Sequence, residues 1–151
     1  MSLDELTRYL HEHIPLTRHL GAAVEAWDGA TVRVGAPLAP NLNHRSTAFG
    51  GSLSALAILS GWALVHLALR QRGIDARVVI QRTELDFEAP VDGDFTATSS
   101  LPPARDWDRF LATLARHRRA RIAVTATLRA ASGVVGGEHR GTYVAVLAGP
   151  R

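Results

Sequence analysis

The chain has 151 residues, of which 46% are hydrophobic and 21% charged, and its formal net charge is +3. This length is typical of one domain with a sizeable core, so we expect a single domain over residues 1–151. The sequence contains neither cysteine nor lysine, which excludes disulfides, thiolate chemistry and Schiff-base catalysis.

The first predicted element is a short amphipathic helix over residues 3–13, with Leu3, Leu6 and Leu10 on one side. Acidic residues and the lack of a continuous apolar run near the start are not typical of a secretory signal, so we expect a cytoplasmic location. Two alternating runs follow, on either side of Asp28-Gly29. An Asp-Gly pair between such runs predicts a β-hairpin.

The longest uncharged stretch runs from Ala48 to Leu69 and is long enough to cross a membrane. Glycines and serines dilute its hydrophobicity, however, and His66 lies within it. Much of the remaining chain alternates like β-strands, which lipid could not accommodate as one open sheet. We therefore interpret the stretch as a core helix over about residues 51–72, ending at Gly73, and expect no membrane partner.

Strand-like segments dominate the second half of the chain. They comprise residues 76–90, a segment after a predicted tight turn at Asp92-Gly93, residues 119–130 with Ile122, Val124, Ala126 and Leu128 on one face, and residues 134–148 with a predicted bulge at Gly136-Gly137. Residues 106–117 predict a short helix or an irregular excursion. The order of elements predicts an α+β fold in which an antiparallel sheet wraps around one long central helix. We expect a second subunit to close the edge at the helix N-terminus.

Several segments resemble the hotdog-fold acyl-CoA thioesterases, most closely those of the YiiD C-terminal-domain type. They are HIPLTRHLG, the loop and helix from APLAPNLNHRSTAFGG onward, FEAPVDGDF, RARIAV and GTYVAVL. Asn43, Thr47, Gly50 and Gly51 are similar to the N-x-x-x-T-x-x-G-G pattern at the mouth of the helix in many of these enzymes. The resemblance implies a hotdog fold and a thioesterase for acyl-CoA or acyl-carrier substrates. It also implies a homodimer or dimer of dimers with its sites between subunits. No metal or covalent cofactor is expected, and coenzyme A enters only as part of the substrate.

The glycine pair has a physical meaning beside the resemblance. First-turn N–H groups are unpaired and lie at the positive end of the helix dipole, so the Gly51 N–H is our candidate donor to a thioester oxyanion. The alternative is that both glycines only permit close packing of the loop. Asn43 could position a water molecule or the carbonyl group, or it could brace its own loop. We expect Thr47 and Gly50 to help form the site, and Phe49 and Ser54 to line a tunnel.

One position departs from the pattern of the resemblance. Many hotdog thioesterases carry a carboxylate on the central helix seven residues after the second glycine, and here that residue is Ile58. Glu84, Asp86 and Glu88 should face away from the helix if Leu85 and Phe87 face it, which leaves Gln81 and Thr83 as polar groups of inward parity. The alternative function is therefore a protein that binds acyl thioesters without hydrolysing them.

An arginine cluster, RHRRAR, occupies residues 116–121. Arg119 and Arg121 would share one strand face and could bind the phosphates of coenzyme A. A solvated turn and RNA binding are the alternatives. Aromatic stacking residues are not interleaved in the cluster, so we do not expect nucleic acid as a partner.

Overall fold

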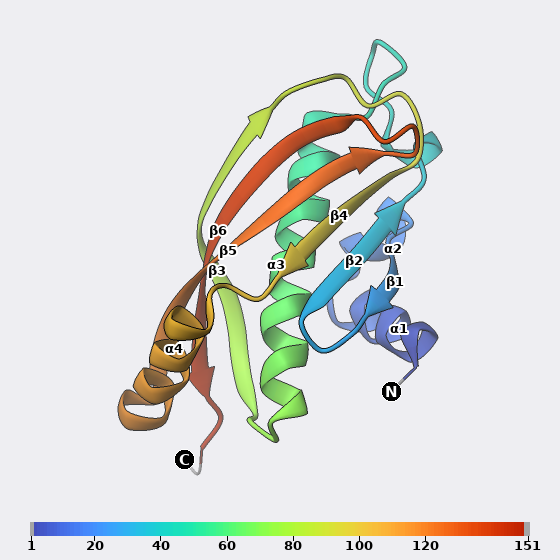
Figure 1. Ribbon diagram of the computed structural model, residues 1–151. Coiled ribbons are helices and arrows are strands. Elements are labelled where there is room, and N and C mark those ends of the chain that lie inside the picture. The colour runs from blue at the N-terminus through green and yellow to red at the C-terminus, as the bar shows by residue number, and fades with distance from the viewer. Residues whose placement is uncertain (1, 150–151) are drawn as a thin grey trace.

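The computed structural model describes residues 2–149, in which a six-stranded antiparallel sheet wraps around one long helix, α3 (Gly50–Gln71) (Figure 1). The sheet has the order β1-β2-β4-β5-β6-β3. Its strands are β1 (Ala23–Trp27), β2 (Thr31–Ala36), β3 (Ala76–Phe87), β4 (Phe95–Ser100), β5 (Arg119–Ala130) and β6 (Val135–Leu147). The other helices are α1 (Leu3–His13), α2 (Leu16–Leu20), the short 3-10 helix η1 (Ala39–Asn41) and α4 (Ala104–His117). This arrangement confirms the predicted hotdog fold.

The N-terminal helix and hairpin form where the local signals predict them. A capping box starts α1, because the Ser2 hydroxyl accepts from the Glu5 N–H and the Glu5 carboxylate accepts from the Ser2 N–H. Leu6 and Leu10 bury the inner side of the helix. In the turn between β1 and β2, the Asp28 carboxylate accepts two backbone N–H groups, which lowers its pKa. The Val24 N–H of β1 donates to the Thr7 hydroxyl of α1 at 2.9 Å, which ties α1 to this edge of the sheet.

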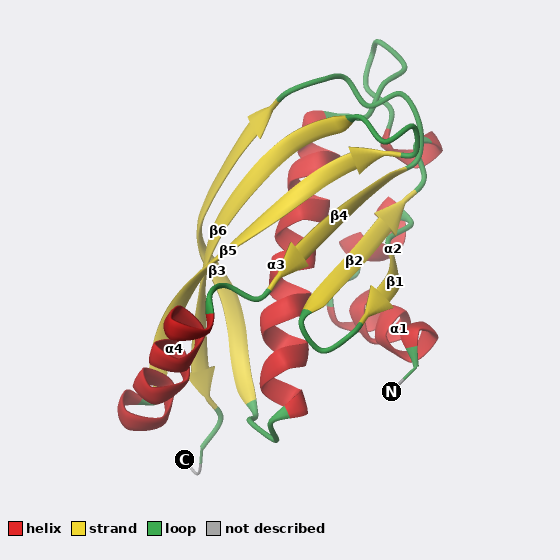
Figure 2. Ribbon diagram, viewed as in Figure 1, coloured by secondary structure: helices red, strands yellow, loops and turns green. Residues whose placement is uncertain are grey.

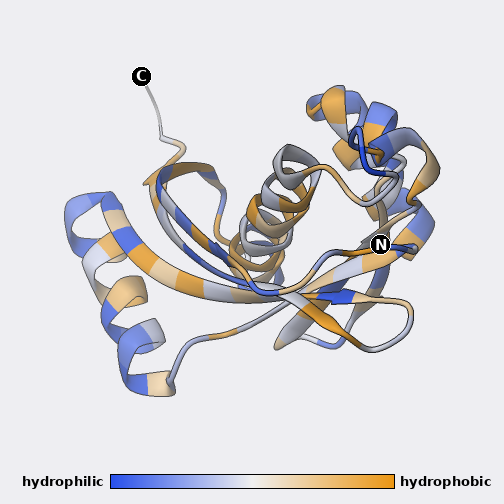
Figure 3. Cartoon of the chain, turned by 90° about the horizontal axis from the view of Figure 1, so that it is seen from above, coloured by the Kyte–Doolittle hydropathy of each residue, from blue (hydrophilic) through white to orange (hydrophobic). Residues whose placement is uncertain are grey.

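The central helix α3 begins and ends within one residue of its predicted bounds. Gly73, with φ at 72°, follows its C-terminal end. Within residues 2–149, α3 is the one helix long and apolar enough to cross a membrane, but 61% of its most apolar window is buried inside the protein. Figure 3 shows the sheet curving around this helix. The interpretation as a core helix is confirmed.

The inner face of the sheet packs on α3 through alternating side chains. Ile122, Val124, Ala126 and Leu128 of β5 are all buried, as predicted. The register of β5 and β6 then shifts, from Leu128 opposite Gly137 to Arg129 opposite Val135. The shift leaves Gly136 without a partner in the ladder and confirms the predicted bulge.

The predicted tight turn at Asp92-Gly93 is wrong. β3 pairs with β6 at one edge of the sheet, whereas β4 lies between β2 and β5, so residues 88–94 form a crossover rather than a hairpin turn. The connection passes over the end of the molecule where α3 begins (Figure 2). An Asp-Gly pair favours a change of direction, but it does not determine which strands become neighbours.

Helix α4 follows β4 and packs against the part of β5 that extends beyond the end of β4. The β4–β5 ladder stops at Ser99 opposite Ala126, so the first residues of β5 have no β4 partner. α4 packs against this part of β5 and buries Trp107, Phe110 and Leu114. The segment predicted as a helix or an irregular excursion is therefore a regular helix.

Candidate active site

A narrow loop, residues 42–48, precedes α3 and protrudes at the top of the view in Figure 1. Leu42 and Ala48 form an isolated antiparallel bridge at its base. The Ala48 N–H donates to the Val91 carbonyl at 2.7 Å, and the Phe49 N–H donates to the Asn41 carbonyl at 2.7 Å. These bonds hold the loop in a fixed position relative to the first turn of α3.

The side chain of Asn43 is engaged inside this loop. Its Oδ1 accepts from the backbone N–H groups of Arg45 at 2.8 Å and Thr47 at 3.1 Å. Its Nδ2 donates to the Thr47 hydroxyl at 2.9 Å and to the Ala48 carbonyl at 3.4 Å. Asn43 was expected either to position a water molecule or the carbonyl group, or to brace its own loop. These contacts favour the second interpretation. Thr47 takes part in the same network.

The first turn of α3 presents unpaired backbone donors. The N–H groups of Ser52 and Leu53 donate to the Phe49 carbonyl at 2.9 and 3.1 Å. No side chain caps the helix, and among the described residues the N–H groups of Gly50 and Gly51 have no acceptor. Gly51 is exposed. The helix start is therefore equipped to bind an oxyanion or another electron-rich oxygen.

Two exposed phenyl rings border these glycines. Phe49 is 55% exposed and Phe87 is 59% exposed. A Cβ added at Gly50 would lie 3.3 Å from the Phe87 ring, and one added at Gly51 would overlap the Phe49 ring. Close packing against a ring therefore coexists with an exposed Gly51 here. Ser54, one turn further along the helix, is half-buried.

A tyrosine forms a hydrogen bond to Ile58, the helix residue that stands where many hotdog thioesterases have a carboxylate. The hydroxyl of Tyr143, a fully buried residue of β6, donates to the Ile58 carbonyl at 2.9 Å. Burial raises the pKa of this hydroxyl, so it stays protonated. In the β3–β6 ladder Glu84 lies opposite Arg140, and Asp86 lies opposite Glu138. Both carboxylates face away from α3, as expected. No carboxylate is among the buried polar residues of the described chain.

The inner face also contains a histidine that the sequence analysis missed. His139 on β6 is 2% exposed, and its Nε2 lies 2.7 Å from the Thr83 hydroxyl. Its Nδ1 is buried without a hydrogen-bond partner, and burial lowers the pKa of the ring. The two-residue spacing of Gly137, His139, Gly141 and Tyr143 was the available signal, because alternate residues of a strand share a face.

Gln81 and the arginine pair, which were predicted to take part in the site, face the outer side of the sheet. The register of β3 shifts between Ile80 and Arg82, which breaks the expected alternation at Gln81. Its side-chain Oε1 instead accepts from Arg121 Nη1 at 3.5 Å, so the predicted inward parity of Gln81 is wrong. Arg119 and Arg121 are exposed on the outer side of β5, opposite the last residues of β6 and away from the glycine pair. Their role in phosphate binding stays a prediction.

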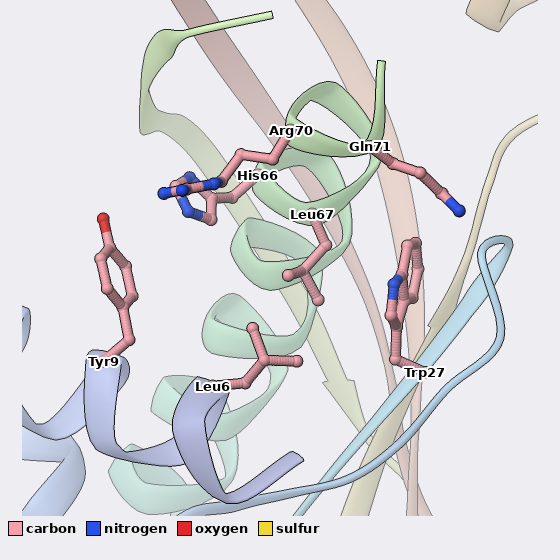
Figure 4. A pocket seen from close by; sticks show the side chains of 7 residues that line it. All are labelled: Leu6, Tyr9, Trp27, His66, Leu67, Arg70 and Gln71. Carbon is pink, nitrogen blue, oxygen red and sulfur yellow. The ribbon is translucent and has the colours of Figure 1, made fainter. Parts of the chain in front are cut away.

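A cleft of about 300 Å³ lies at the other end of α3, between α1, β1 and the last turns of the helix (Figure 4). Its lining consists of Leu6, Tyr9, Trp27, His66, Leu67, Arg70 and Gln71. The His66 ring stacks between those of Trp62 and Tyr9, with centroids 4.7 and 5.4 Å away. Burial is the main cause that lowers its pKa to about 4. None of the predicted site residues lines this cleft.

Comparisons with known proteins agree with this fold. A family model described as "Putative thioesterase (yiiD_Cterm)" matches residues 3–147. A protein of unknown function from Chlorobaculum tepidum is 27% identical, with a TM-score of 0.90 over 96% of this chain and 94% of that chain. A "putative thioesterase" from Shewanella oneidensis is 28% identical, with a TM-score of 0.86 over 95% and 96% of the two chains. A "Probable Thioesterase" from Pseudomonas aeruginosa is 25% identical, with a TM-score of 0.81 over 96% of each chain.

Proposed function

The chain belongs to the YiiD_C family of the "Putative thioesterase (yiiD_Cterm)" description, and on that premise we propose that it hydrolyses acyl-CoA or acyl-carrier thioesters. The observation that carries the proposal is the start of α3, where the N–H groups of Gly50 and Gly51 have no acceptor among the described residues. Coenzyme A takes part only as a portion of the substrate, and the proposed reaction uses no metal or covalent cofactor. The proposed location is the cytoplasm.

The Gly51 N–H is the proposed oxyanion donor. Attack on a thioester turns its carbonyl oxygen into an oxyanion, and a positioned N–H donor typically lowers the barrier by ~3 kcal/mol. The exposed rings of Phe49 and Phe87 beside the glycines supply an apolar wall for the acyl chain, and half-buried Ser54 lies one turn further along the same helix. Asn43 and Thr47 maintain the loop that sets the direction of the first helical turn.

We propose a homodimer, or a dimer of dimers, with the site between subunits. β3 is a 12-residue edge strand whose outer side has no partner among the described strands. Long free edges are normally paired or covered in native proteins. Leu42, Phe49 and Phe87 are each about half exposed at the same end of the molecule, and a second subunit over them would bury this apolar surface.

A second function, binding of acyl thioesters without hydrolysis, is supported by Ile58. A general base usually contributes ~10²–10⁴-fold to a rate, and an isoleucine cannot act as one. Glu84 and Asp86 face the outer side of the sheet in the same chain. The hydrolytic proposal therefore requires a water molecule positioned without a helix carboxylate.

A panel of acyl-CoA substrates with a free-thiol readout tests the proposal. Gly51→Pro removes the N–H in a helical turn that tolerates proline, next to a glycine that has no Cβ to clash with the proline ring. Gly51→Ala adds a Cβ in the same place but keeps the N–H, so it is the matched control. We expect Gly51→Pro to lose ~10²–10³-fold in kcat and Gly51→Ala far less. Equal losses would refute the donor role. Saturable binding without thiol release from the unaltered protein would establish the second function.

A further inference from the structure

Thr83 and His139 form a hydrogen-bonded pair on the inner face of the sheet, outside the glycine loop. Thr83 lies opposite Gly141 in the β3–β6 ladder, and Tyr143, the next residue on that face of β6, donates to the Ile58 carbonyl. Thr83 therefore lies, on the same face of the sheet, one position along the ladder from the tyrosine that bonds the helix residue where the carboxylate is missing. Thr83 is exposed, because it belongs to the free edge strand, whereas His139 is 2% exposed.

The buried nitrogen of His139 determines where the ring carries its proton. Nε2 is 2.7 Å from the Thr83 hydroxyl, and this bond can form with the proton on either partner. Nδ1 has no partner in either case. A proton on Nδ1 would leave a buried N–H without an acceptor, and such orphaned donors are rarer in native proteins than under-satisfied acceptors. The Nε2–H tautomer avoids this arrangement. An imidazolium would reintroduce it, and burial also lowers the pKa of the ring.

This tautomer controls the Thr83 hydroxyl. When Nε2–H donates to Thr83 Oγ1, the hydroxyl hydrogen is left to donate to another group. In the Nδ1–H tautomer, the Thr83 hydroxyl would have to donate its hydrogen to Nε2 of the ring and could not donate it elsewhere. A thioester substrate offers carbonyl oxygens, both at the reacting carbon and in the amides of the pantetheine arm.

We propose that Thr83 donates a hydrogen bond to a carbonyl oxygen of an acyl-pantetheine substrate, and that His139 is the positioning residue that fixes this donation. The inference rests on the proposed thioester ligand, but not on its hydrolysis. It assigns to His139 a role that requires no contact with the substrate and no transfer of a proton.

The tautomer is tested directly by ¹⁵N NMR of the histidine rings, with His139→Gln to assign the signal. We expect His139 to be neutral at pH 7 with its proton on Nε2. A proton on Nδ1, or an imidazolium, would overturn the proposal. The measurement needs no substrate, so it stays informative if hydrolysis is absent.

The donation itself is tested with Thr83→Val, which removes the hydroxyl at nearly constant shape, and Thr83→Ser, which restores it. We expect kcat/KM to fall at least tenfold in Thr83→Val and to recover in Thr83→Ser. A fall in kcat assigns the thioester carbonyl, and a rise in KM assigns a pantetheine amide. If wild type binds acyl-CoA without releasing thiol, the same variants are compared by calorimetric affinity. Equal values for Val and wild type contradict the proposal.

Coupling between the two residues separates positioning from a merely structural role. His139→Leu should lower kcat/KM towards the level of Thr83→Val, and the double variant should be no worse than Thr83→Val alone. His139→Gln, whose amide can still donate to Thr83, should retain more activity than His139→Leu. Losses that multiply in the double variant would show that His139 acts independently of Thr83. Thermal unfolding of each variant verifies that it folds.

Discussion

Gly61→Ala should destabilise the protein, although the helix propensities of the two residues predict the opposite. Alanine in a helix interior is favoured over glycine by ~1 kcal/mol. At this position, however, the added Cβ would overlap the hydroxyl and ring of Tyr143. That ring is fully buried, and its hydroxyl donates to the Ile58 carbonyl at 2.9 Å, so it cannot move aside freely.

The magnitude follows from these opposing effects. Overpacking a well-filled core costs ~1–3 kcal/mol, and loss of the tyrosine hydrogen bond costs ~1 kcal/mol more. After the gain in helix propensity, we expect a net loss of about 2 kcal/mol. In a domain of this size, such a loss lowers Tm by roughly 4–8 °C. Urea unfolding followed by circular dichroism measures the free energy.

Two controls isolate the cause. Gly51→Ala also places a Cβ against a ring, but Phe49 is 55% exposed and can swing away, so we expect a change of no more than about 0.5 kcal/mol. In a Tyr143→Leu background the clash is removed, and Gly61→Ala should then be neutral or stabilising. If Gly61→Ala alone unfolds at the same or a higher urea concentration than wild type, the packing of α3 on β6 at this point is wrong.

Three further outcomes are expected. Asn41→Ala should cost about 2–3 kcal/mol in urea unfolding, because the buried Nδ2 donates to the carbonyl oxygens of Leu20 and Pro37; a cost under about 0.5 kcal/mol would contradict this role. Asn43→Ala should lower kcat at least tenfold through loss of the loop bonds, and Asn43→Asp, which keeps both accepted N–H bonds, should retain more activity; equal kcat values in the free-thiol assay would argue against this role. His66 has a folded pKa of about 4, below its ordinary value near 6.5, so the unfolded chain takes up a proton first as the pH falls. Stability is therefore fully present above about pH 6.5 and declines towards pH 4. Tm measured at several pH values should decline less in His66→Gln, and parallel profiles would refute the contribution.

Elements with a regular period could be predicted from the sequence. The alternation of Ile122, Val124, Ala126 and Leu128 correctly predicts β5 and its inner face, and the uncharged run from Ala48 to Leu69 predicts the central helix. In both cases one short-range pattern persists over many residues, so small irregularities do not alter the result. The glycine pair at the helix start could also be found in the sequence, because a helix terminus depends only on residues that are close together in the chain.

Features that depend on distant partners could not be predicted in this way. The choice of β6 as the neighbour of β3 turns Asp92-Gly93 from a hairpin into a crossover. One extra residue between Ile80 and Arg82 reverses the side of the sheet that Gln81 faces. His139 is a single polar residue in a strand, and its importance follows only from burial and from the hydroxyl that approaches it across the sheet. Pairing, irregular register and burial are all set by the folded chain as a whole.

The hydrogen bond from the Ala48 N–H to the Val91 carbonyl ties two connections that lie far apart along the chain. Through this bond the crossover after β3 helps to fix the position of the glycine loop before α3. A substitution within residues 88–94 can therefore shift the loop beside the proposed acyl site through the backbone, while every residue of α3 is left unchanged.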